Sequence, residues 1–449
     1  MIIDPARSPL LTDLYQFTML QVYHAAGMTD GAVFELHFRR FAGDRAFLMA
    51  AGSESVLEWL EQLAFSPEEC AWLNSTGRFS SEFIASLADF RFTGDVDAMP
   101  EGTIFFAEEP VLRITAPLRE AQLIESRVLN LIHLQTLVAA KAARCVLAAG
   151  GRLPLVDFGL RRAYGAEAGM LAARAAYVAG FAGTATVLAG ERFGIPLFGT
   201  MAHSYIEAHP DEEEAFVRFG RVHPHNTTLL IDTYDIVRGA ERAARAALRL
   251  AAEGIRVQAV RIDSGNCAAV ARQVRAVLDR NGCRDVRIMA TGNLDEYALA
   301  GLLAADVPVD ACGIGTRLVI PSAPPDPDCA YKLVAYAGRP RLKCSAGKAT
   351  WPGAKQVWRE YRDGMMVADT IGLAEEKLPG RPLLVPMLRN GKRVAVPEPL
   401  AAARTRAAAE CAALPAELRR LDGGDSAPFP VERTPAVVQL RSATEREFR

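Results

Sequence analysis

Polar residues that can bind anions and sugars follow short apolar runs in the middle of the chain. Arg161 follows LPLVDF, His203 follows IPLFGT, and two aspartates, Asp232 and Asp263, follow TTLLI and VQAV. Arginine matches a carboxylate with two parallel hydrogen bonds, a carboxylate binds sugar hydroxyls, and imidazole can act as a nucleophile. These residue types can together bind carboxylate, ribose and phosphate groups.

The elements that must position these residues form a series of βα units. From about Val111 to Val319, short apolar runs alternate with Ala-, Leu- and Arg-rich stretches of helical period, a pattern typical of parallel strands joined by helices. Such strands make an open sheet or a barrel. In a βα barrel the carboxyl ends of the strands converge on one mouth, so we expect the polar clusters to face one cavity.

The flanking segments predict a second α/β domain. We expect residues 1–110 to form an N-terminal α/β domain, residues 111–320 the βα-barrel catalytic domain, and residues 321–449 a C-terminal β-rich segment with a helical tail. Strand and turn patterns in the C-terminal segment indicate that it returns to pack on the N-terminal domain. The predicted fold class is α/β, an irregular βα barrel with a second α/β domain built from both ends of the chain.

The composition limits the classes of function. The 449 residues carry 51 Lys and Arg against 53 Asp and Glu, so no net basic field exists to hold nucleic acid or an anionic membrane. The N-terminus has charges, Asp4, Arg7 and Asp13, where a signal peptide needs an unbroken apolar core. The eight cysteines show no CxxC pair and no zinc-type spacing. We therefore expect a soluble, cytoplasmic protein that acts on a small ligand and has no metal-ligating set of its own.

Two glycine-containing turns and one helix start could hold a phosphate. Gly292 with Asn293 follows VRIMA, and Gly315 with Thr316 follows VDAC. Missing side chains let backbone amides approach a phosphate closely, and Thr316 adds a hydroxyl. Ser264 precedes a predicted helix, whose free N–H groups can also receive a phosphate. Glycine turns are most often plain turns, so by themselves they are weak signals.

Seven motifs, in the same order along the chain, resemble those of nicotinate phosphoribosyltransferase. They are LLTDLYQFTM, DFGLRRAYG, FGTMAHSYIEA, LIDTYD, VRIDSGN, ATGNLDEY and GIGTRL. The resemblance runs from about Pro9 to Leu318, and GRPLLVPMLRNGKR resembles the C-terminal portion of the family. It implies a type II phosphoribosyltransferase-like barrel, a homodimer with shared active sites, and transfer of a phosphoribosyl group from phosphoribosyl pyrophosphate to nicotinate.

The resemblance assigns the pyridine ring and its carboxylate to five residues. It implies that Phe158 lies against the ring, that Arg161, Thr200 and Arg261 lie near the base, and that Tyr15 closes the other face from the partner subunit. A flat ring with a carboxylate suits aromatic faces and a fixed guanidinium. The alternative interpretation places Phe158 in the core and makes the arginines surface charges.

Three residues are assigned catalytic roles, Asp263 and His203 by the same resemblance and Asp232 by the chemistry that the histidine needs. Asp263 would bind the ribose, although Asp263 and Ser264 taken alone could be only a helix cap. His203 lies in GTMAHS, whose histidine the family phosphorylates with ATP, whereas a lone histidine is usually structural. A nucleophilic imidazole needs one free ring nitrogen and an acceptor for the other, and Asp232 is the candidate acceptor. ATP is the implied co-substrate, and Mg²⁺ is the implied cofactor that neutralises the departing pyrophosphate.

Ala185 bears on the choice of substrate. In nicotinamide-using relatives an Asp of a GTDT element accepts a hydrogen bond from the amide, whereas this chain has GTAT at residues 183–186. An Asp beside a carboxylate substrate would repel it, so Ala185 favours nicotinate over nicotinamide. The rival interpretations are a related phosphoribosyltransferase for nicotinamide or quinolinate, and a phosphosugar-binding barrel without catalysis. The second rival has no need of His203.

Overall fold

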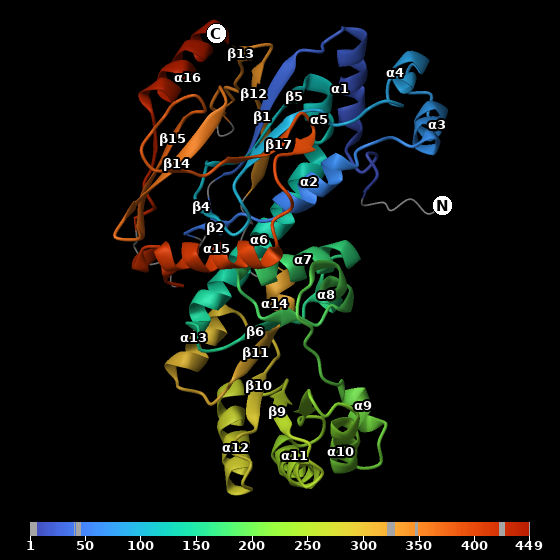
Figure 1. Ribbon diagram of the computed structural model, residues 1–449, viewed down its shortest axis with the longest axis vertical. Coiled ribbons are helices and arrows are strands. Elements are labelled where there is room, and N and C mark those ends of the chain that lie inside the picture. The colour runs from blue at the N-terminus through green and yellow to red at the C-terminus, as the bar shows by residue number, and fades with distance from the viewer. Residues whose placement is uncertain are drawn as a thin grey trace. The chain divides into compact units, whose positions relative to one another are not determined.

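The chain divides into two compact units. The computed structural model describes residues 7–39, 41, 46–320, 328–345, 349–421 and 427–448. Unit 1 consists of Met1–Ala140 together with Ala323–Arg449, and unit 2 consists of Lys141–Ser322 (Figure 1). The two ends of the chain thus share one unit, and the series of βα elements lies in the other.

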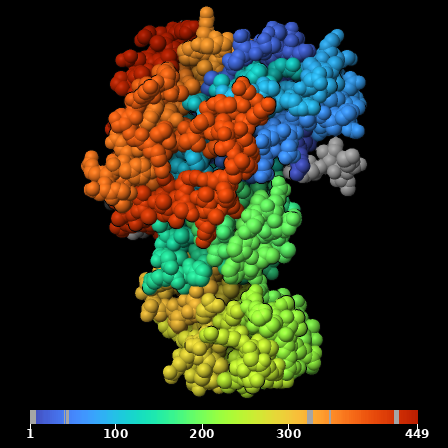
Figure 2. Space-filling view, in the orientation of Figure 1, coloured from blue at the N-terminus to red at the C-terminus, as the bar shows by residue number. Residues whose placement is uncertain are grey.

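The main sheet of unit 1 has seven strands and joins both ends of the chain. Its strand β1 (Gly31–Phe38) lies antiparallel between β5 (Pro110–Pro117) and β12 (Cys329–Tyr336). Figure 2 shows the N-terminal and C-terminal segments side by side in this unit. The sheet order is β13 (Arg339–Pro340), β12, β1, β5, β3 (Asp95–Ala98), β17 (Val385–Arg389) and β18 (Lys392–Arg393).

The expected domain boundary at residue 110 differs from the one in the structure. Residues 111–140 belong to unit 1, because β5 pairs with both β1 and β3 in the antiparallel sheet. An apolar strand followed by a helix looks the same in sequence whether it adds to a parallel or an antiparallel sheet. The boundary expected at residue 320 is close to the one at Ser322.

The C-terminal strands and helices complete unit 1. β14 (Lys355–Arg362) and β15 (Met365–Leu373) form the centre of a second sheet, in the order β16-β14-β15-β19. The remaining elements are β2 (Leu48–Met49), β4 (Ile104–Phe105), β16 (Arg381–Pro382), β19 (Val431–Arg433), α1 (Leu14–Ala25), α2 (Ser53–Glu61), α3 (Pro67–Ser75), α4 (Ser81–Ala85), α5 (Leu118–Leu123), α15 (Leu400–Ala413), the 3₁₀ turn η3 (Ala416–Arg419) and α16 (Pro435–Phe448).

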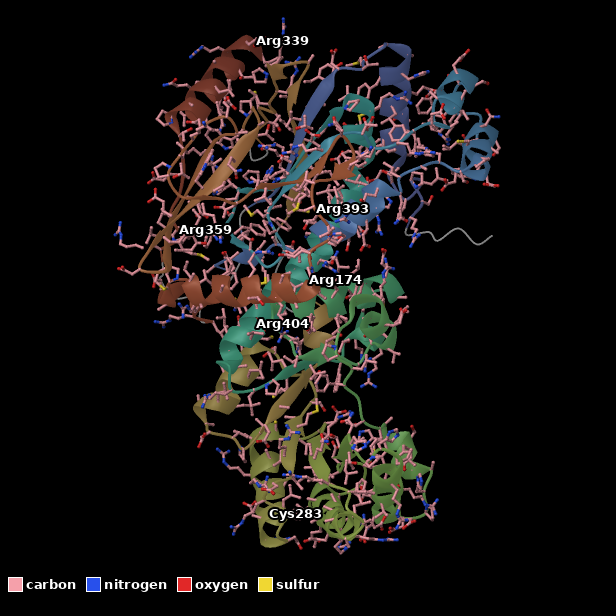
Figure 3. All side chains as sticks on the ribbon, viewed as in Figure 1. Arg174, Cys283, Arg339, Arg359, Arg393 and Arg404 are labelled. Atoms are coloured by element: carbon pink, nitrogen blue, oxygen red, sulfur yellow. The ribbon has the colours of Figure 1, made fainter. Side chains whose placement is uncertain are left out.

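A fully buried arginine ties these elements together. Arg359 of β14 (Figure 3) donates two hydrogen bonds to Asp369 of β15, at 2.9 and 2.5 Å, and one to Glu410 of α15 at 3.0 Å. Burial and the charge of Asp369 raise the pKa of the neighbouring Glu109 carboxyl well above its ordinary value. Buried charges are stable only when paired in this way, so the network fixes α15 against the second sheet.

The sheet of unit 2 has six strands, all parallel. The first and last strands of the series, β6 and β11, are neighbours, which is the topology of a barrel, while β7 and β8 lie at the two edges. The expected irregular βα barrel is therefore confirmed as a curled half-barrel. Its strands are β6 (Leu155–Asp157), β7 (Gly183–Thr184), β8 (Thr227–Leu230), β9 (Val257–Ile262), β10 (Arg287–Ala290) and β11 (Ala311–Ile314).

The helices of unit 2 begin directly after the loops that follow the strands. Asp235, Asn266 and Asp295 each cap a helix by accepting a backbone N–H three residues ahead, which satisfies a donor at the helix start. The helices are α7 (Ala166–Ala179), α8 (Val187–Phe193), α9 (His203–Glu207), α10 (Glu212–Val222), α11 (Ile236–Ala251), α12 (Cys267–Arg280), α13 (Glu296–Ala304) and α14 (Thr316–Val319).

One described helix is long and apolar enough to cross a membrane by length and composition. This is α6 (Glu125–Ala149), which joins the two units in sequence. Most of its apolar window, 61%, is buried inside the protein, as expected of a core helix.

Candidate functional site

The turn after β6 is held by a buried carboxylate. Asp157 accepts a hydrogen bond from the backbone N–H of Gly159 at 2.8 Å and another from the hydroxyl of Thr184 at 2.6 Å. Burial raises the pKa of the Asp157 carboxyl above its ordinary value, and these two bonds oppose that shift. The DFG segment is thereby fixed to β7, and Phe158 between the two anchored residues has a defined position.

The Phe158 ring lies at the carboxyl end of the sheet beside Arg261. The guanidinium carbon of Arg261 is 5.8 Å from the centre of the ring, within the range of a cation–π contact. Gly313 lies between the ring and Thr291, because a Cβ at residue 313 would come within 2.7 Å of Phe158 Cε2 and 2.8 Å of Thr291 Cγ2. Half-buried Phe158 is therefore placed beside a guanidinium, as an aromatic carboxylate requires.

Arg261 is the centre of a polar cluster at the end of β9. Its Nη1 donates to the Thr200 hydroxyl at 3.2 Å and to the Met201 carbonyl at 3.3 Å, and its Nε donates to the Thr291 hydroxyl at 3.2 Å. Its Nη2 lies 3.4 Å from Asp263 Oδ2. The guanidinium thus joins the ends of β9 and β10 to the segment before α9, and the 12% exposure of its side chain leaves a part open to solvent.

Asp232 links the loops after β8 and β9. Its Oδ2 accepts the backbone N–H of Asp263 at 2.9 Å and the Ser264 hydroxyl at 2.6 Å. Its Oδ1 is buried and has no hydrogen-bond partner among the described residues. Asp263 keeps 24% of its side chain exposed, and the Thr291 hydroxyl donates to its Oδ1. The helix cap of α12 is Asn266, so Asp263 and Ser264 are not used as that cap.

His203 begins α9 and pairs with Thr233. Its Nδ1 lies 3.1 Å from the Thr233 hydroxyl. The expected partner, Asp232, directs its Oδ2 to Asp263 and Ser264 in the described structure, so its contact with His203 stays a prediction. The ring is half-buried and its Nδ1 is the engaged nitrogen, so Nε2 is the nitrogen available for chemistry.

The two expected phosphate turns lie at neighbouring strand ends. Gly292 has φ +92°, and a Cβ there would lie 2.4 Å from the Asp263 carbonyl, so only glycine allows this approach. Asn293 also has a positive φ, 50°. Gly315 precedes α14, which Thr316 begins. Since β10 and β11 are adjacent, the two turns present their backbone on the same edge of the sheet.

Three expected residues are not joined to this cluster. Arg161 is exposed in the short 3₁₀ turn Leu160–Arg162 and forms no ion pair with any described residue. Ala185 is exposed, and its N–H donates to the Asp157 carbonyl at 2.9 Å. Tyr15 belongs to unit 1, where it is 47% exposed and its hydroxyl lies 3.4 Å from Glu125.

Three residues of the cluster lie outside the set expected from the sequence. Asp157 and Thr184 anchor the DFG turn, and Thr291 connects Arg261 with Asp263. Each follows or ends an apolar run, the signal by which the other residues were found. Thr and Asp are also frequent in ordinary turns, so position alone does not separate them from structural residues.

The two described cavities contain none of the candidate residues. The larger, 510 Å³, lies in unit 1 and is lined by ionisable residues that include Glu35, His37 and Lys355. Burial lowers the pKa of His37 to about 4. The smaller, 240 Å³, lies near Tyr234 and Arg242 in unit 2.

The sequence matches two family models. Residues 10–133 match the nicotinate phosphoribosyltransferase N-terminal domain, and residues 153–281 match the nicotinate phosphoribosyltransferase family. Together the two matches span more than half of the chain and include most of the cluster described above.

Characterised relatives and solved structures cover nearly the whole chain. The chain is 49% identical over 424 residues to nicotinate phosphoribosyltransferase pncB2 of Mycobacterium tuberculosis, covering 94% of this chain and 91% of the relative. The crystal structure of human nicotinic acid phosphoribosyltransferase superimposes with a TM-score of 0.86 at 30% identity, covering 96% of this chain and 99% of the human one. A nicotinate-nucleotide pyrophosphorylase from Pyrococcus furiosus superimposes with a TM-score of 0.74 at 26% identity, over 91% and 96% of the two chains.

The half-barrel with its strand-end cluster and these matches define a phosphoribosyltransferase enzyme. The chain belongs to the nicotinate phosphoribosyltransferase family. This membership argues against a phosphosugar-binding barrel without catalysis.

Proposed function

We propose that the protein joins nicotinate to the phosphoribosyl group of phosphoribosyl pyrophosphate, giving nicotinate mononucleotide and pyrophosphate for NAD salvage. The observation that carries the proposal is the position of Arg261 between the Phe158 ring and the Asp263 carboxylate. One guanidinium is thus near both an aromatic face for the base and an acceptor for the ribose.

The base is bound by stacking and by charge. Phe158 takes one face of the pyridine ring, and Arg261 with the Thr200 hydroxyl takes the carboxylate. Arg161 is exposed at the edge of the same turn and supplies a second cation when it folds over the bound carboxylate. Ala185 places no anion beside the base, which favours nicotinate over nicotinamide.

The phosphoribosyl group is bound by the loops after β9, β10 and β11. Asp263 accepts hydrogen bonds from the ribose hydroxyls, and its charge opposes the positive charge that develops on the sugar as pyrophosphate departs. Ser264, the Gly292–Asn293 turn and the Gly315–Thr316 turn direct backbone N–H groups to the 5′-phosphate. The pyridine nitrogen then forms a bond with C1 of the ribose as the bond from C1 to pyrophosphate breaks, so these residues act by positioning and electrostatics.

ATP coupling is assigned to His203. Nε2 attacks the γ-phosphate of ATP and releases ADP, while the Nδ1–Thr233 contact orients the ring. Hydrolysis of the phosphohistidine returns the free imidazole. His203 follows Thr200 and Met201, which contact Arg261, so phosphorylation acts on the segment that orients the base.

Mg²⁺ is consistent with the carboxylates present. No group of three or more His, Cys, Asp or Glu in the described ranges is placed to hold a metal ion, whereas Mg²⁺ bound to phosphates needs only one or two protein carboxylates. Asp232, with its unpartnered Oδ1, and Asp263 would hold it. When bound, the ion neutralises charge on the departing pyrophosphate.

The active site is proposed to be shared across a cytoplasmic homodimer, with Tyr15 closing the base pocket of the partner. The exposed ring of Tyr15 and its exposed neighbours Leu11 and Leu14 support an interface at this end of α1. Mixing Tyr15→Ala with His203→Ala chains under conditions of subunit exchange tests this arrangement. Recovery of ATP-coupled activity requires a hybrid with one intact site; no recovery despite proven exchange contradicts sharing.

The decisive test of the reaction is pyrophosphate release with nicotinate, nicotinamide and quinolinate assayed in parallel. We expect release with nicotinate, stimulated by ATP, and little with the other two bases. His203→Ala should abolish phosphohistidine and ATP hydrolysis while a slow transfer without ATP remains. Equal release with nicotinamide would contradict the role of Ala185, and no release with nicotinate would contradict the reaction.

A further inference from the structure

The hydroxyl of Thr291 lies between the two charged residues of the proposed site. Its Oγ1 accepts from Arg261 Nε at 3.2 Å and donates to Asp263 Oδ1, with the Ile262 carbonyl oxygen as a second acceptor at 3.1 Å. Thr291 follows β10, its backbone N–H bonds the Ile262 carbonyl at 2.9 Å, and its side chain is 6% exposed. The hydroxyl is therefore fixed from the backbone and buried at the point where the guanidinium and the carboxylate approach each other.

A hydroxyl at this position can accept a hydrogen bond from Arg261 and donate one to Asp263. A guanidinium can only donate hydrogen bonds and an ionised carboxylate can only accept them, whereas a hydroxyl does one of each. The direct contact between Arg261 Nη2 and Asp263 Oδ2 is 3.4 Å long, beyond the usual length of a charge-assisted hydrogen bond. The Thr291 hydroxyl thus occupies Arg261 Nε and Asp263 Oδ1. The guanidinium and the carboxylate therefore do not form a bidentate ion pair with each other.

The methyl group of Thr291 fixes the direction of the hydroxyl. Gly313 lies directly beside Thr291 Cγ2 and the Phe158 ring, and a β-branched side chain has few rotamers available in such a space. The Thr291 methyl group therefore lies on the side of Gly313, and the Thr291 oxygen lies on the side of the two charged groups. Serine in its place would keep the oxygen and lose the packing.

We propose that Thr291 is a positioning residue that holds Arg261 and Asp263 apart, so that Arg261 keeps donors for the nicotinate carboxylate and Asp263 keeps an oxygen for the ribose. The inference rests on the proposed function and extends it to a residue that contacts neither substrate. It predicts that loss of the hydroxyl weakens the binding of both substrates, because the freed Arg261 guanidinium and Asp263 carboxylate then pair with each other. A change confined to Asp263 would instead weaken mainly the binding of phosphoribosyl pyrophosphate.

The test compares Thr291→Val and Thr291→Ser with Thr136→Val. Valine keeps the shape and removes the hydroxyl, so we expect the Michaelis constants for nicotinate and phosphoribosyl pyrophosphate each to rise about tenfold, with a smaller change in kcat. Serine should restore most of the affinity. Thr136 is the matched control in unit 1, since it is buried and donates to the Ala51 carbonyl at 3.2 Å, and its valine variant should change only the melting temperature.

A crystal structure of the Thr291→Val enzyme supplies the independent measurement. We expect Arg261 and Asp263 to form a closed pair with both contacts below about 3.0 Å. An unchanged separation of the two groups, or Michaelis constants equal to wild type in an enzyme that folds normally, overturns the role of Thr291. If the wild-type enzyme releases no pyrophosphate with nicotinate, the proposed function fails, and the crystal structure still decides whether Thr291 holds the pair apart.

Discussion

Each unit contains an arginine held by carboxylates, and the two differ in how completely the arginine is satisfied. Arg359 in unit 1 is 0% exposed and bonds Asp369 at 2.9 and 2.5 Å and the Ile104 carbonyl at 2.7 Å. Arg261 in unit 2 is partly exposed, and its hydrogen bonds and ion pair are 3.2 to 3.4 Å long.

This difference separates charge used for folding from charge kept for a ligand. A buried ion pair offsets its desolvation only when further hydrogen bonds satisfy its donors, and each of the three guanidinium nitrogens of Arg359 has a hydrogen bond within the chain. Longer bonds to hydroxyls and a carbonyl leave Arg261 able to exchange partners when an anion arrives. The same residue type therefore stabilises unit 1 and, in the proposed function, binds substrate in unit 2.

Removing Arg359 should give the largest change in stability. Arg359→Met leaves Asp369 buried without its cation and removes one of the two cations paired with Glu410, so the free energy of unfolding should fall by about 3 to 5 kcal/mol. Chemical denaturation measures the change. Arg381→Met is the matched control, because Arg381 also pairs with Glu410 but is 47% exposed, and its loss should cost at most about 1 kcal/mol. Equal effects of the two variants would contradict the distinction.

The same substitution at Arg261 should act on catalysis instead. Arg261→Met should lower kcat/KM for nicotinate by about 100-fold or more, because a desolvated guanidinium–carboxylate contact is lost. The unfolding free energy should change by less than about 1 kcal/mol, since the remaining Asp263 stays partly hydrated. Steady-state kinetics and denaturation on the same preparation provide both values. A loss of stability as large as that of Arg359→Met would show that Arg261 mainly stabilises the fold, as Arg359 does.

Asp263 should distinguish the two substrates. Asp263→Ala should weaken the binding of phosphoribosyl pyrophosphate by about 3 kcal/mol, the value of two hydrogen bonds to a charged group. The binding of nicotinate should weaken by much less. Calorimetric titration of each ligand measures the difference. Equal weakening of both would indicate that the loop after β9 has collapsed.

Glu109 should give the unit 1 network a pH dependence. Its pKa is raised in the folded protein by burial and by Asp369, so the folded state holds a proton that the unfolded chain releases near the ordinary value for Glu. The contribution of Glu109 to the free energy of unfolding is therefore largest below about pH 4. It falls as the pH rises toward the pKa of Glu109 in the folded protein. Glu109→Gln should gain stability relative to wild type as the pH is raised from 4 to 8. A constant difference across that range would remove Glu109 from the network.

The sequence predicts the strand ends well because parallel topology is local. Arg261, Asp263 and Gly292 could be placed on one edge of a sheet from the alternation of apolar runs and helices. The partner of His203 could not, because Asp232 and Thr233 are adjacent in sequence and only the direction of each side chain separates them. The unit boundary also required the structure, since β5 has the same apolar pattern as a barrel strand.

The antiparallel pairing of β1 with β12 affects the order in which the two units can fold during synthesis on the ribosome. Unit 2 is a single continuous stretch, Lys141–Ser322, whereas β1 cannot gain its partner Cys329–Tyr336 until more than three hundred residues have been made. Domains emerging from the ribosome fold as units, so we expect the half-barrel to fold before the unit that begins and ends the chain. Until then one edge of β1 is open to pairing with other chains. A ribosome stalled once Ser322 has left the exit tunnel would therefore carry a folded unit 2 and an N-terminal segment in which one edge of β1 is unpaired.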